Sequence, residues 1–265
     1  MNEPLQPVQA LRLRADDRAP HEDRVIVEAP IALLYNGEPF AVMMATPGSL
    51  EDFALGFALG EGIVANASEF RLVDVVRHAQ GIALHAAIPQ ARFDALGERR
   101  RALEGRSGCG LCGVESLQAA LRPVPRVSST KRVDVQTIRL VLDALAMQQP
   151  LNALSGGVHA AGFAHDGGLL VREDVGRHNA LDKLIGAMAR EAIAPDAGFV
   201  VITSRASYEI VHKAATAGIG LVVAISAPTD LAIRTADAAG MTLAAFARGD
   251  SLNVYAHPER IAASR

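Results

Sequence analysis

Apolar positions in the first half of the chain occur as short runs that turn residues separate. Asn36-Gly37 and Gln80-Gly81 each join two such runs, and an Asn-Gly pair between apolar runs is a strong hairpin signal. The four runs cover residues 25–35, 39–45, 71–77 and 82–88. Between the two pairs, residues 51–62 begin with acidic side chains and place Phe53 and Phe57 four apart, which predicts a helix.

The second half of the chain alternates between the two hydrophobic periodicities. Apolar residues spaced i, i+3, i+4, i+7 predict helices, and Asp166-Gly167-Gly168 between two short runs predicts a hairpin. Gly218 and Gly240 each close a predicted helix. The elements expected in order are a helix at 138–145, strands at 158–163 and 169–173, a helix at 180–190, a strand at 199–203, a helix at 208–217, a strand at 221–225, a helix at 230–239 and a last main strand at 241–247.

This alternation with short links predicts a three-layer α/β sandwich in the C-terminal half, beside a smaller α+β subdomain in the N-terminal half. Residues 1–24 are charged with few apolar positions, which predicts a flexible tail. Pro123 and Pro125 interrupt the chain and mark a boundary. We therefore expect a tail over 1–24, an α+β subdomain with the cysteines over 25–125, and an α/β nucleotide- or cofactor-binding subdomain over 126–265.

Composition and charge narrow the classes of function. The 265 residues are 50% hydrophobic and 21% charged, as in ordinary globular proteins, and the net charge of -3 provides no general field for nucleic acid. The start of the chain lacks the apolar core of a signal peptide, and the longest uncharged apolar-rich run, 214–229, is shorter than the roughly 20 residues that span a bilayer. We expect a soluble cytoplasmic protein with no nucleic-acid or membrane partner.

Both cysteines of the chain lie in one glycine-rich segment, residues 107–113, with the sequence Ser-Gly-Cys-Gly-Leu-Cys-Gly. The glycines leave the thiols of Cys109 and Cys112 sterically open. A helix expected to follow, at 114–121, and the nearby Arg106 both favour a thiolate. A thiolate is the nucleophile for disulfide exchange and equally for accepting a sulfur atom as a persulfide.

Spacing alone leaves several interpretations of this Cys-x-x-Cys open. A structural zinc site needs four ligands, and the chain has no second cysteine pair. A thioredoxin-like dithiol follows a strand, whereas residues 90–106 before this pair are charged. That stretch, with Arg99-Arg100-Arg101, is a solvated face or a contact for an anion or partner. An inert structural pair is a further alternative. We favour reactive-thiol chemistry, with sulfur transfer first, and predict no metal site.

Polar residues gather where the predicted strands of the second half end, and ligands of α/β sheets bind at the carboxyl ends of strands. Hydroxyls, arginines and helix N-termini together suit a phosphate or pyrophosphate. The polar segments cover residues 155–159, 172–179, 203–207, 226–229 and 246–251. The ligand candidates drawn from them are Arg177, His178, Ser204, Arg205, Ser207, Phe246, Ala247, Arg248, Gly249, Asp250 and Ser251.

Each of these segments also has a purely structural interpretation. Ser207 would be a helix N-cap, and residues 246–251 a charged turn. The block 172–179 would be a capped helix start, with Asp182 and Lys183 on its exposed face. His159 is either a core histidine or a polar group that lines the same pocket. As ligands, Arg248 would bind phosphate and Asp250 would accept hydrogen bonds from a guanine edge.

Taken together in order, the sequence blocks resemble the FdhD/NarQ family of formate dehydrogenase accessory sulfurtransferases. The resemblance extends over about 25–261. The blocks that show it are LEDFALGFALGEGI, GRSGCGLCG, SGGVHAAGFA, REDVGRHNALDKLIG, SRASYEIVHKAATAGI, SAPTDLAI and FARGDSLNVYAHPERI.

The resemblance implies a sulfur carrier between a cysteine desulfurase and molybdenum bis(molybdopterin guanine dinucleotide), which is cargo that later enters formate dehydrogenase. It implies Cys109 as the persulfide carrier, Cys112 as its partner and 246–251 as the cofactor-binding block. It also implies a dimer and a fold of the cytidine-deaminase type. The deaminase zinc pattern is missing, so deamination is not expected. Two alternatives stay open: a cofactor-binding chaperone without sulfur transfer, and a thiol-disulfide oxidoreductase.

Overall fold

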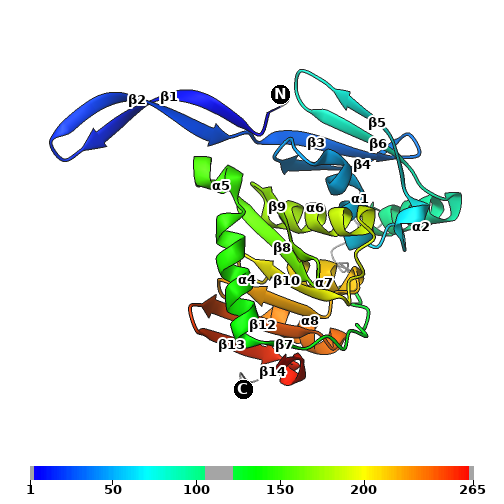
Figure 1. The fold of residues 1–265 in the computed structure, drawn as a ribbon. Coiled ribbons are helices and arrows are strands. Elements are labelled where there is room, and N and C mark those ends of the chain that lie inside the picture. Colours follow the sequence, from blue (N-terminus) through cyan, green and yellow to red (C-terminus); the bar gives the residue numbers. More distant parts are fainter. Residues whose placement is uncertain (1–2, 105–121, 263–265) are drawn as a thin grey trace, which may run out of the picture.

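The computed structural model describes residues 3–104 and 122–262, and its first element is a long two-stranded hairpin. Strands β1 (Leu5–Arg14) and β2 (Asp17–Ile26) pair antiparallel along their whole length. Figure 1 shows this hairpin extending away from the rest of the molecule. The sequence predicted a flexible tail for residues 1–24, and the structure differs. The charges lie at solvent-exposed positions of a ribbon, where they are compatible with strand pairing.

A four-stranded sheet follows the hairpin, in the order β4-β3-β6-β5. The hairpins predicted around Asn36-Gly37 and Gln80-Gly81 are both confirmed. Helix α1 packs on one face of this sheet through Phe53 and Phe57, and α2 follows the last strand. The elements are β3 (Ala29–Tyr35), β4 (Glu38–Ala45), α1 (Leu50–Gly60), η1 (Ala67–Glu69), β5 (Arg71–Arg77), β6 (Ile82–Ala87) and α2 (Gln90–Glu104).

The C-terminal half forms a six-stranded sheet in the order β13-β12-β11-β10-β8-β9. Its predicted helices and strands are confirmed, and β13 is an edge strand beyond the last main strand expected. A short parallel pair, β7 (Val133–Asp134) with β14 (Ile261–Ala262), lies near the C-terminus. The remaining elements are α4 (Val135–Met147), α5 (Pro150–Ser155), β8 (His159–His165), β9 (Gly168–Asp174), α6 (Arg177–Arg190), β10 (Gly198–Ile202), α7 (Tyr208–Thr216), β11 (Leu221–Ala224), α8 (Asp230–Ala239), β12 (Thr242–Arg248), β13 (Ser251–Ala256) and η2 (Pro258–Arg260).

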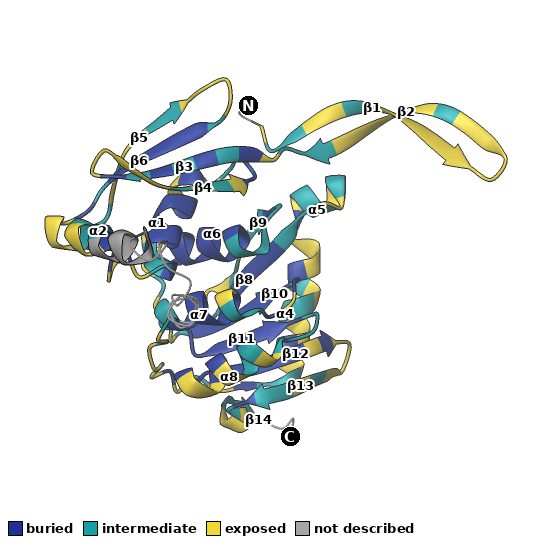
Figure 2. Cartoon of the chain, turned by 180° about the vertical axis from the view of Figure 1, so that it is seen from behind, coloured by how far each residue is buried: buried dark blue, intermediate teal, exposed yellow. Residues whose placement is uncertain are grey.

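Helices cover both faces of the larger sheet. Helices α6, α7 and α8 bury one face in a cluster that includes Leu184, Val211 and Val222, whereas α4 covers the other through Ile138 and Leu145. Figure 2 shows the central strands β8, β10 and β11 between these helix layers as buried. The division of the chain at residue 125 stays a prediction.

The two sheets are joined through a close crossing of α1 and α6 (Figure 1). A Cβ atom added at Gly56 would lie 1.7 Å from the backbone oxygen of Asp182, and one added at Gly186 would lie 1.9 Å from that of Asp52. Real side chains never approach this closely, so glycine is required at both positions. The crossing sets how the smaller sheet sits on the larger one.

Candidate functional site: the strand-end rim

The central strands of the larger sheet run parallel, so their carboxyl ends lie at one edge. β10 pairs with β11, and β11 with β12, in parallel register. β9 ends at the same edge because β8 runs antiparallel to both β9 and β10. Adjacent strands lie about 4.8 Å apart, so the ends of β9 and β12 are about 19 Å apart. We call the loops along this edge the strand-end rim; it suits an extended ligand better than a small ion.

Backbone hydrogen bonds join the loops that follow β10 and β11 to each other and to the last residues of β12. The Ala206 amide donates to the Ala227 oxygen at 3.1 Å, and the Thr229 amide donates to the Ala206 oxygen at 3.0 Å. The Phe246 amide donates to the Ser226 oxygen at 3.2 Å. The polar segments that the sequence analysis singled out at these three strand ends are therefore side by side.

Thr203 extends the rim toward β8. Its backbone amide donates to the Ala160 oxygen at 3.0 Å, and its hydroxyl accepts from the Ala160 amide at 2.9 Å. This pairing places His159 beside the loop of Ser204 and Arg205. Ser204 is buried, and its hydroxyl donates to the Arg205 oxygen at 3.1 Å, whereas Arg205 is exposed. Thr203 lies in the polar segment 203–207 of the sequence analysis but was not among the ligand candidates, and its pairing depends on a neighbouring strand.

His178 and Ser207 bring the starts of α6 and α7 together at the rim. The Nε2 atom of His178 lies 3.2 Å from the Ser207 hydroxyl oxygen and 3.6 Å from Glu209 Oε2. Burial, and then the charge of Arg177, lower the pKa of His178 to about 4, so the ring is neutral at pH 7. Ser207 occupies the N-cap position of α7 but makes no capping bond with its side chain. Its hydroxyl is engaged with His178 instead.

Arg177 lies at the first position of α6, among the polar groups of the rim. Its Nε atom is buried and has no hydrogen-bond partner among the residues that the structure describes. The guanidinium also lowers the pKa of His159, after the larger effect of burial. An unsatisfied buried N–H of a permanent cation is a donor suited to an anionic oxygen. This group was among the predicted ligand candidates, and its contact with a ligand stays a prediction.

The block 246–251 covers the end of β12 and the turn after it, and one of its side chains pairs with α4, which covers one face of the sheet. Phe246 is 44% exposed and has a φ of 53°, a conformation rare for a bulky residue. It lies at a register irregularity between β12 and β13. Asp250, proposed for a guanine edge, pairs with Arg139 of α4 at 2.5 Å. Ala247 is buried, whereas Arg248, Gly249 and Ser251 are exposed at the turn.

Cys109 and Cys112 lie outside the described residues, as does the helix expected at 114–121. The chain re-enters the described structure at Arg122, whose backbone amide donates to the Tyr208 hydroxyl at 2.9 Å. The side chain of Arg122 pairs with Glu61 at 2.7 Å. Tyr208 directly follows Ser207, so the chain returns from the cysteine segment beside the rim.

Two buried ion pairs join α6 to its neighbours close to the rim. Lys183 pairs with Asp174 at 2.6 Å, and Lys213 pairs with Asp182 at 2.8 Å. Asp182 and Lys183 are almost wholly buried, so the expectation that they lie on an exposed face is wrong. Their partners come from β9 and α7, which a pattern along α6 alone does not reveal. Asp174 also accepts a hydrogen bond from the Gly176 amide at 2.8 Å, just before Arg177.

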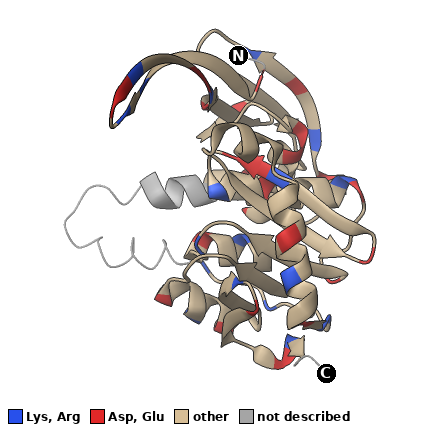
Figure 3. Cartoon of the chain, turned by 60° about the vertical axis from the view of Figure 1, so that its left-hand side comes forward, with Lys and Arg blue, Asp and Glu red and all other residues tan. Residues whose placement is uncertain are grey.

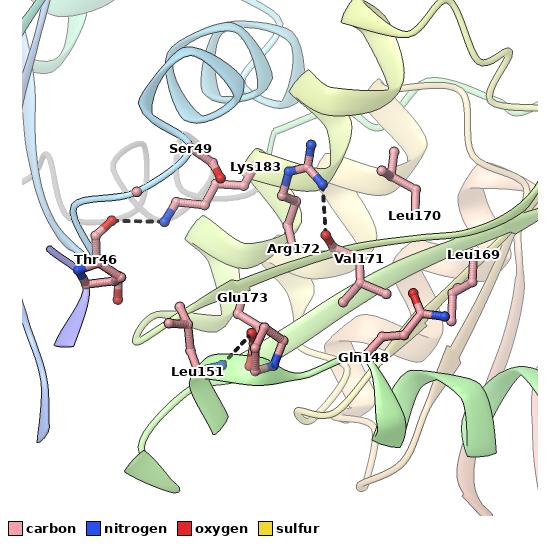
Figure 4. Close-up of a pocket in the computed structure, with 13 residues that line it drawn as sticks. Thr46, Ser49, Gln148, Leu151, Leu169, Leu170, Val171, Arg172, Glu173 and Lys183 are labelled. Carbon is pink, nitrogen blue, oxygen red and sulfur yellow. Dashed lines mark hydrogen bonds between the residues drawn. The ribbon is translucent and has the colours of Figure 1, made fainter. Parts of the chain in front are cut away.

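A cavity of about 500 Å³ lies along β9, between this strand, the start of α1 and α5 (Figure 4). Its charged lining groups are engaged with the protein itself. Lys183 donates to the Thr46 oxygen at 2.9 Å, Glu173 accepts from the Leu151 amide at 2.9 Å, and Arg172 pairs with Asp52 at 2.8 Å. We therefore regard this cavity as part of the junction between the two sheets.

No helix within 3–104 and 122–262 is both long and apolar enough to cross a bilayer. In the same ranges, no three His, Cys, Asp or Glu side chains come close enough together to hold a metal ion.

The fold is that of an α/β protein whose polar loops line the strand-end rim. A solved structure described as a formate dehydrogenase accessory protein from Desulfotalea psychrophila superposes with a TM-score of 0.74 at 25% identity. The match covers 97% of this chain and 99% of that chain. Residues 26–262 match the FdhD/NarQ family, and the chain belongs to that family.

Curated relatives agree with this assignment. The protein of Xanthomonas campestris pv. campestris named "Sulfur carrier protein FdhD" is 55% identical over 252 residues, which are 94% of this chain and 90% of that protein. A protein of the same name from Bordetella petrii is 48% identical over 245 residues, which are 92% of this chain and 88% of that protein. The resemblance inferred from the sequence blocks is thus confirmed.

Proposed function

We propose that this protein is a sulfur carrier that accepts persulfide sulfur from a cysteine desulfurase and transfers it to molybdenum bis(molybdopterin guanine dinucleotide) before that cargo enters formate dehydrogenase. The observation on which the proposal rests is family membership over 26–262. In that family, relatives at 48–55% identity are named sulfur carriers. The Cys-x-x-Cys of this chain supplies the sulfur chemistry, and the strand-end rim suits the nucleotide part of the cargo.

Three features of the rim support this assignment of the cargo site. Its length of about 19 Å between the ends of β9 and β12 accommodates an extended nucleotide. Arg177 offers an unsatisfied buried N–H to a phosphate oxygen. Arg205, after β10, and Arg248, at the end of β12, are exposed further along the rim. Phe246 offers an exposed ring on which a guanine base can stack. Asp250 is engaged with Arg139 and would have to leave that pair to contact the guanine edge.

The position of Arg122 supports the link between the thiols and the rim. Cys112 is ten residues before Arg122 in sequence, and ten extended residues span at most about 35 Å. Arg122 is fixed to Tyr208 at the start of α7. The covalent chain therefore allows the thiols to reach any part of a rim about 19 Å long.

In the proposed chemistry one thiolate accepts the sulfur, and the second either releases it or assists its transfer; release proceeds as follows. The Cys109 thiolate attacks the terminal sulfur of the desulfurase persulfide, which forms Cys109-S-SH and releases the desulfurase thiolate. The Cys112 thiolate then attacks the inner sulfur, so a Cys109–Cys112 disulfide forms and the terminal sulfur leaves as sulfide toward molybdenum. A thiol reductant of the cell returns the pair to its starting state. The protein acts as a sulfurtransferase in this scheme.

The proposal includes a fold assignment, a compartment and an assembly state. The larger sheet with helices on both faces fits a cytidine-deaminase-type sandwich, with the smaller four-stranded sheet as the N-terminal subdomain. We infer a cytoplasmic homodimer, as the family resemblance implies. We assign no resident metal, and the molybdenum cofactor is cargo.

The alternative is a chaperone that binds the same cofactor without transferring sulfur, and one experiment separates the two. The protein is incubated with a cysteine desulfurase and cysteine, and GDP binding is measured in parallel by calorimetry. We expect a gain of about 32 Da at Cys109, lost in Cys109→Ala while GDP binding is unchanged. GDP binding without any gain of mass on Cys109 would establish the chaperone and refute sulfur transfer.

A further inference from the structure

The N-terminal hairpin, β1 and β2, is an arm with no support along most of its length. Each strand is ten residues long, so the arm extends about 33 Å from its base. Its outer half is exposed in Figure 2, and both views show it directed away from the four-stranded sheet of its own chain. A lone two-stranded hairpin is at best marginally stable in water, so this arm needs a surface to cover.

One face of the arm presents two exposed leucines near its tip, among charged neighbours that include Arg18, the partner of Leu13. Directly paired residues of an antiparallel ribbon point to the same side, and alternate residues share a face. Leu11 pairs with Pro20, and Leu13 lies two residues further toward the tip on the same face. Leu11 is 47% exposed and Leu13 68% exposed. The opposite face at the same distance from the base has Ala10 and Arg12.

A matching bare face lies on the four-stranded sheet. Helix α1 covers the side to which Ile31 and Leu33 point. The other side has Val42 and Met44 of β4, which are 65% and 49% exposed. Ala32 is paired with Val42 and extends this side onto β3. None of the helices in 3–104 and 122–262 packs on it.

We propose that the arm of one chain covers the bare face of the four-stranded sheet in a second copy of this chain, and that the two copies exchange arms reciprocally. The arm cannot reach this face in its own chain, because it is directed away from it (Figures 1 and 2). The proposal deepens the homodimer of the proposed function and rests on it. It identifies the surfaces that the dimer uses.

Area and charge both favour a second copy as the occupant. One face of the arm offers about 330 Å², and two arms on two sheets remove about 1,300 Å² from water, within the range of about 1,200–2,000 Å² for stable interfaces. The arm balances opposite charges, as Figure 3 shows, so it has no net charge that a second copy of the same chain would repel. The charged residues are Arg12, Arg14, Arg18 and Arg24 with Asp16, Asp17, Glu22 and Asp23.

Sedimentation velocity of matched variants tests the proposal. Leu11→Lys should raise the dimer dissociation constant about 100-fold, because each dimer loses two buried leucines. Ala10→Lys adds the same charge one residue away on the opposite face, and it should change the constant less than about threefold. Equal effects of the two variants, or none, would overturn arm exchange and leave the dimer of the proposed function intact.

A second test uses disulfide formation, since an introduced lysine could itself unfold the hairpin. In chains with Cys109→Ser and Cys112→Ser, Leu13→Cys is mixed with Val42→Cys and oxidised. We expect a covalent mixed dimer, with at least about fivefold less product when Arg14→Cys, on the opposite face, replaces Leu13→Cys. Equal yields would contradict the proposal. A monomeric unaltered chain would overturn both this interface and the dimer, whereas failure of sulfur loading on Cys109 would concern only the carrier role.

Discussion

The two main sheets of this protein differ in how many of their faces are covered. The six-stranded sheet has helices on both sides, so both of its faces are buried in hydrophobic clusters. The loops at its strand ends are the part of this sheet that we consider for ligands. The four-stranded sheet has α1 on one side only, and Val42 and Met44 stay exposed on the other. We propose that ligands bind at the strand ends of the sheet that is covered on both faces, and that a second chain binds the open face of the other sheet.

The largest effect is expected where the two sheets are joined. Gly56→Ala should destabilise the protein by more than about 3 kcal/mol, because the added Cβ would meet the backbone of α6 and force the helices apart. Urea unfolding monitored by circular dichroism measures this change. We expect both sheets to lose stability together, since the crossing joins them.

Gly97→Ala is the matched control for this prediction. Gly97 lies in α2, and a Cβ there would have no neighbour within 4 Å among the residues that the structure describes. Alanine in an open helical position should stabilise the protein by about 0.5–1 kcal/mol. Similar unfolding midpoints for the two variants would mean that the close α1–α6 crossing does not limit stability.

Local patterns in the sequence predicted most elements of both sheets, because each has its own short-range signature. Asn36-Gly37 gives the first hairpin, and Gly218 and Gly240 close their helices with φ of 82° and 67°. The two strands of the arm were not predicted, because neither face of the hairpin packs on a hydrophobic core. Its sequence therefore lacks a clear alternation of apolar and polar residues. Strand β13 was not predicted because it lies at an edge, after a turn that was interpreted as a ligand block.

The sequence predicted which polar segments form the site, but not which side chains of different elements contact one another. Polar strand ends follow from the order of elements, and the parallel register then places them on one edge. The burial of Asp182 and Lys183 could not be predicted, since Lys213 and Asp174 reach them from other elements. The contact between His178 and Ser207 likewise joins two helix starts that are far apart in sequence.

A smaller effect, dependent on pH, is expected at the rim of the doubly covered sheet. The pKa of His178 is about 4 in the folded protein, against a usual value near 6.5, because burial disfavours the charged ring. Between these values the unfolded chain binds the proton and the folded chain does not. Stability should therefore fall as pH falls through this window, by up to about 1.4 kcal/mol per pH unit from this group.

Unfolding in urea between pH 4.5 and 7 measures how the unfolding free energy depends on pH. His178→Gln should remove the part of this dependence that comes from the histidine. NMR titration of the ring provides an independent check that does not depend on stability. A ring that takes up its proton near pH 6.5 in the folded protein would contradict the burial of His178 at the rim.

The smallest effect is expected on the bare face of the four-stranded sheet. Val42→Thr keeps the shape of the side chain and adds a hydroxyl that water can reach, so it should change the unfolding free energy of a single chain by less than about 0.5 kcal/mol. Val201→Thr makes the same change on a buried face of β10 and should cost about 1–3 kcal/mol. Unfolding measured at two protein concentrations separates the contribution of the dimer. A penalty at Val42 that appears only at the higher concentration would show that a second chain covers this face, whereas an equal penalty at both would mean that the face is already buried within one chain.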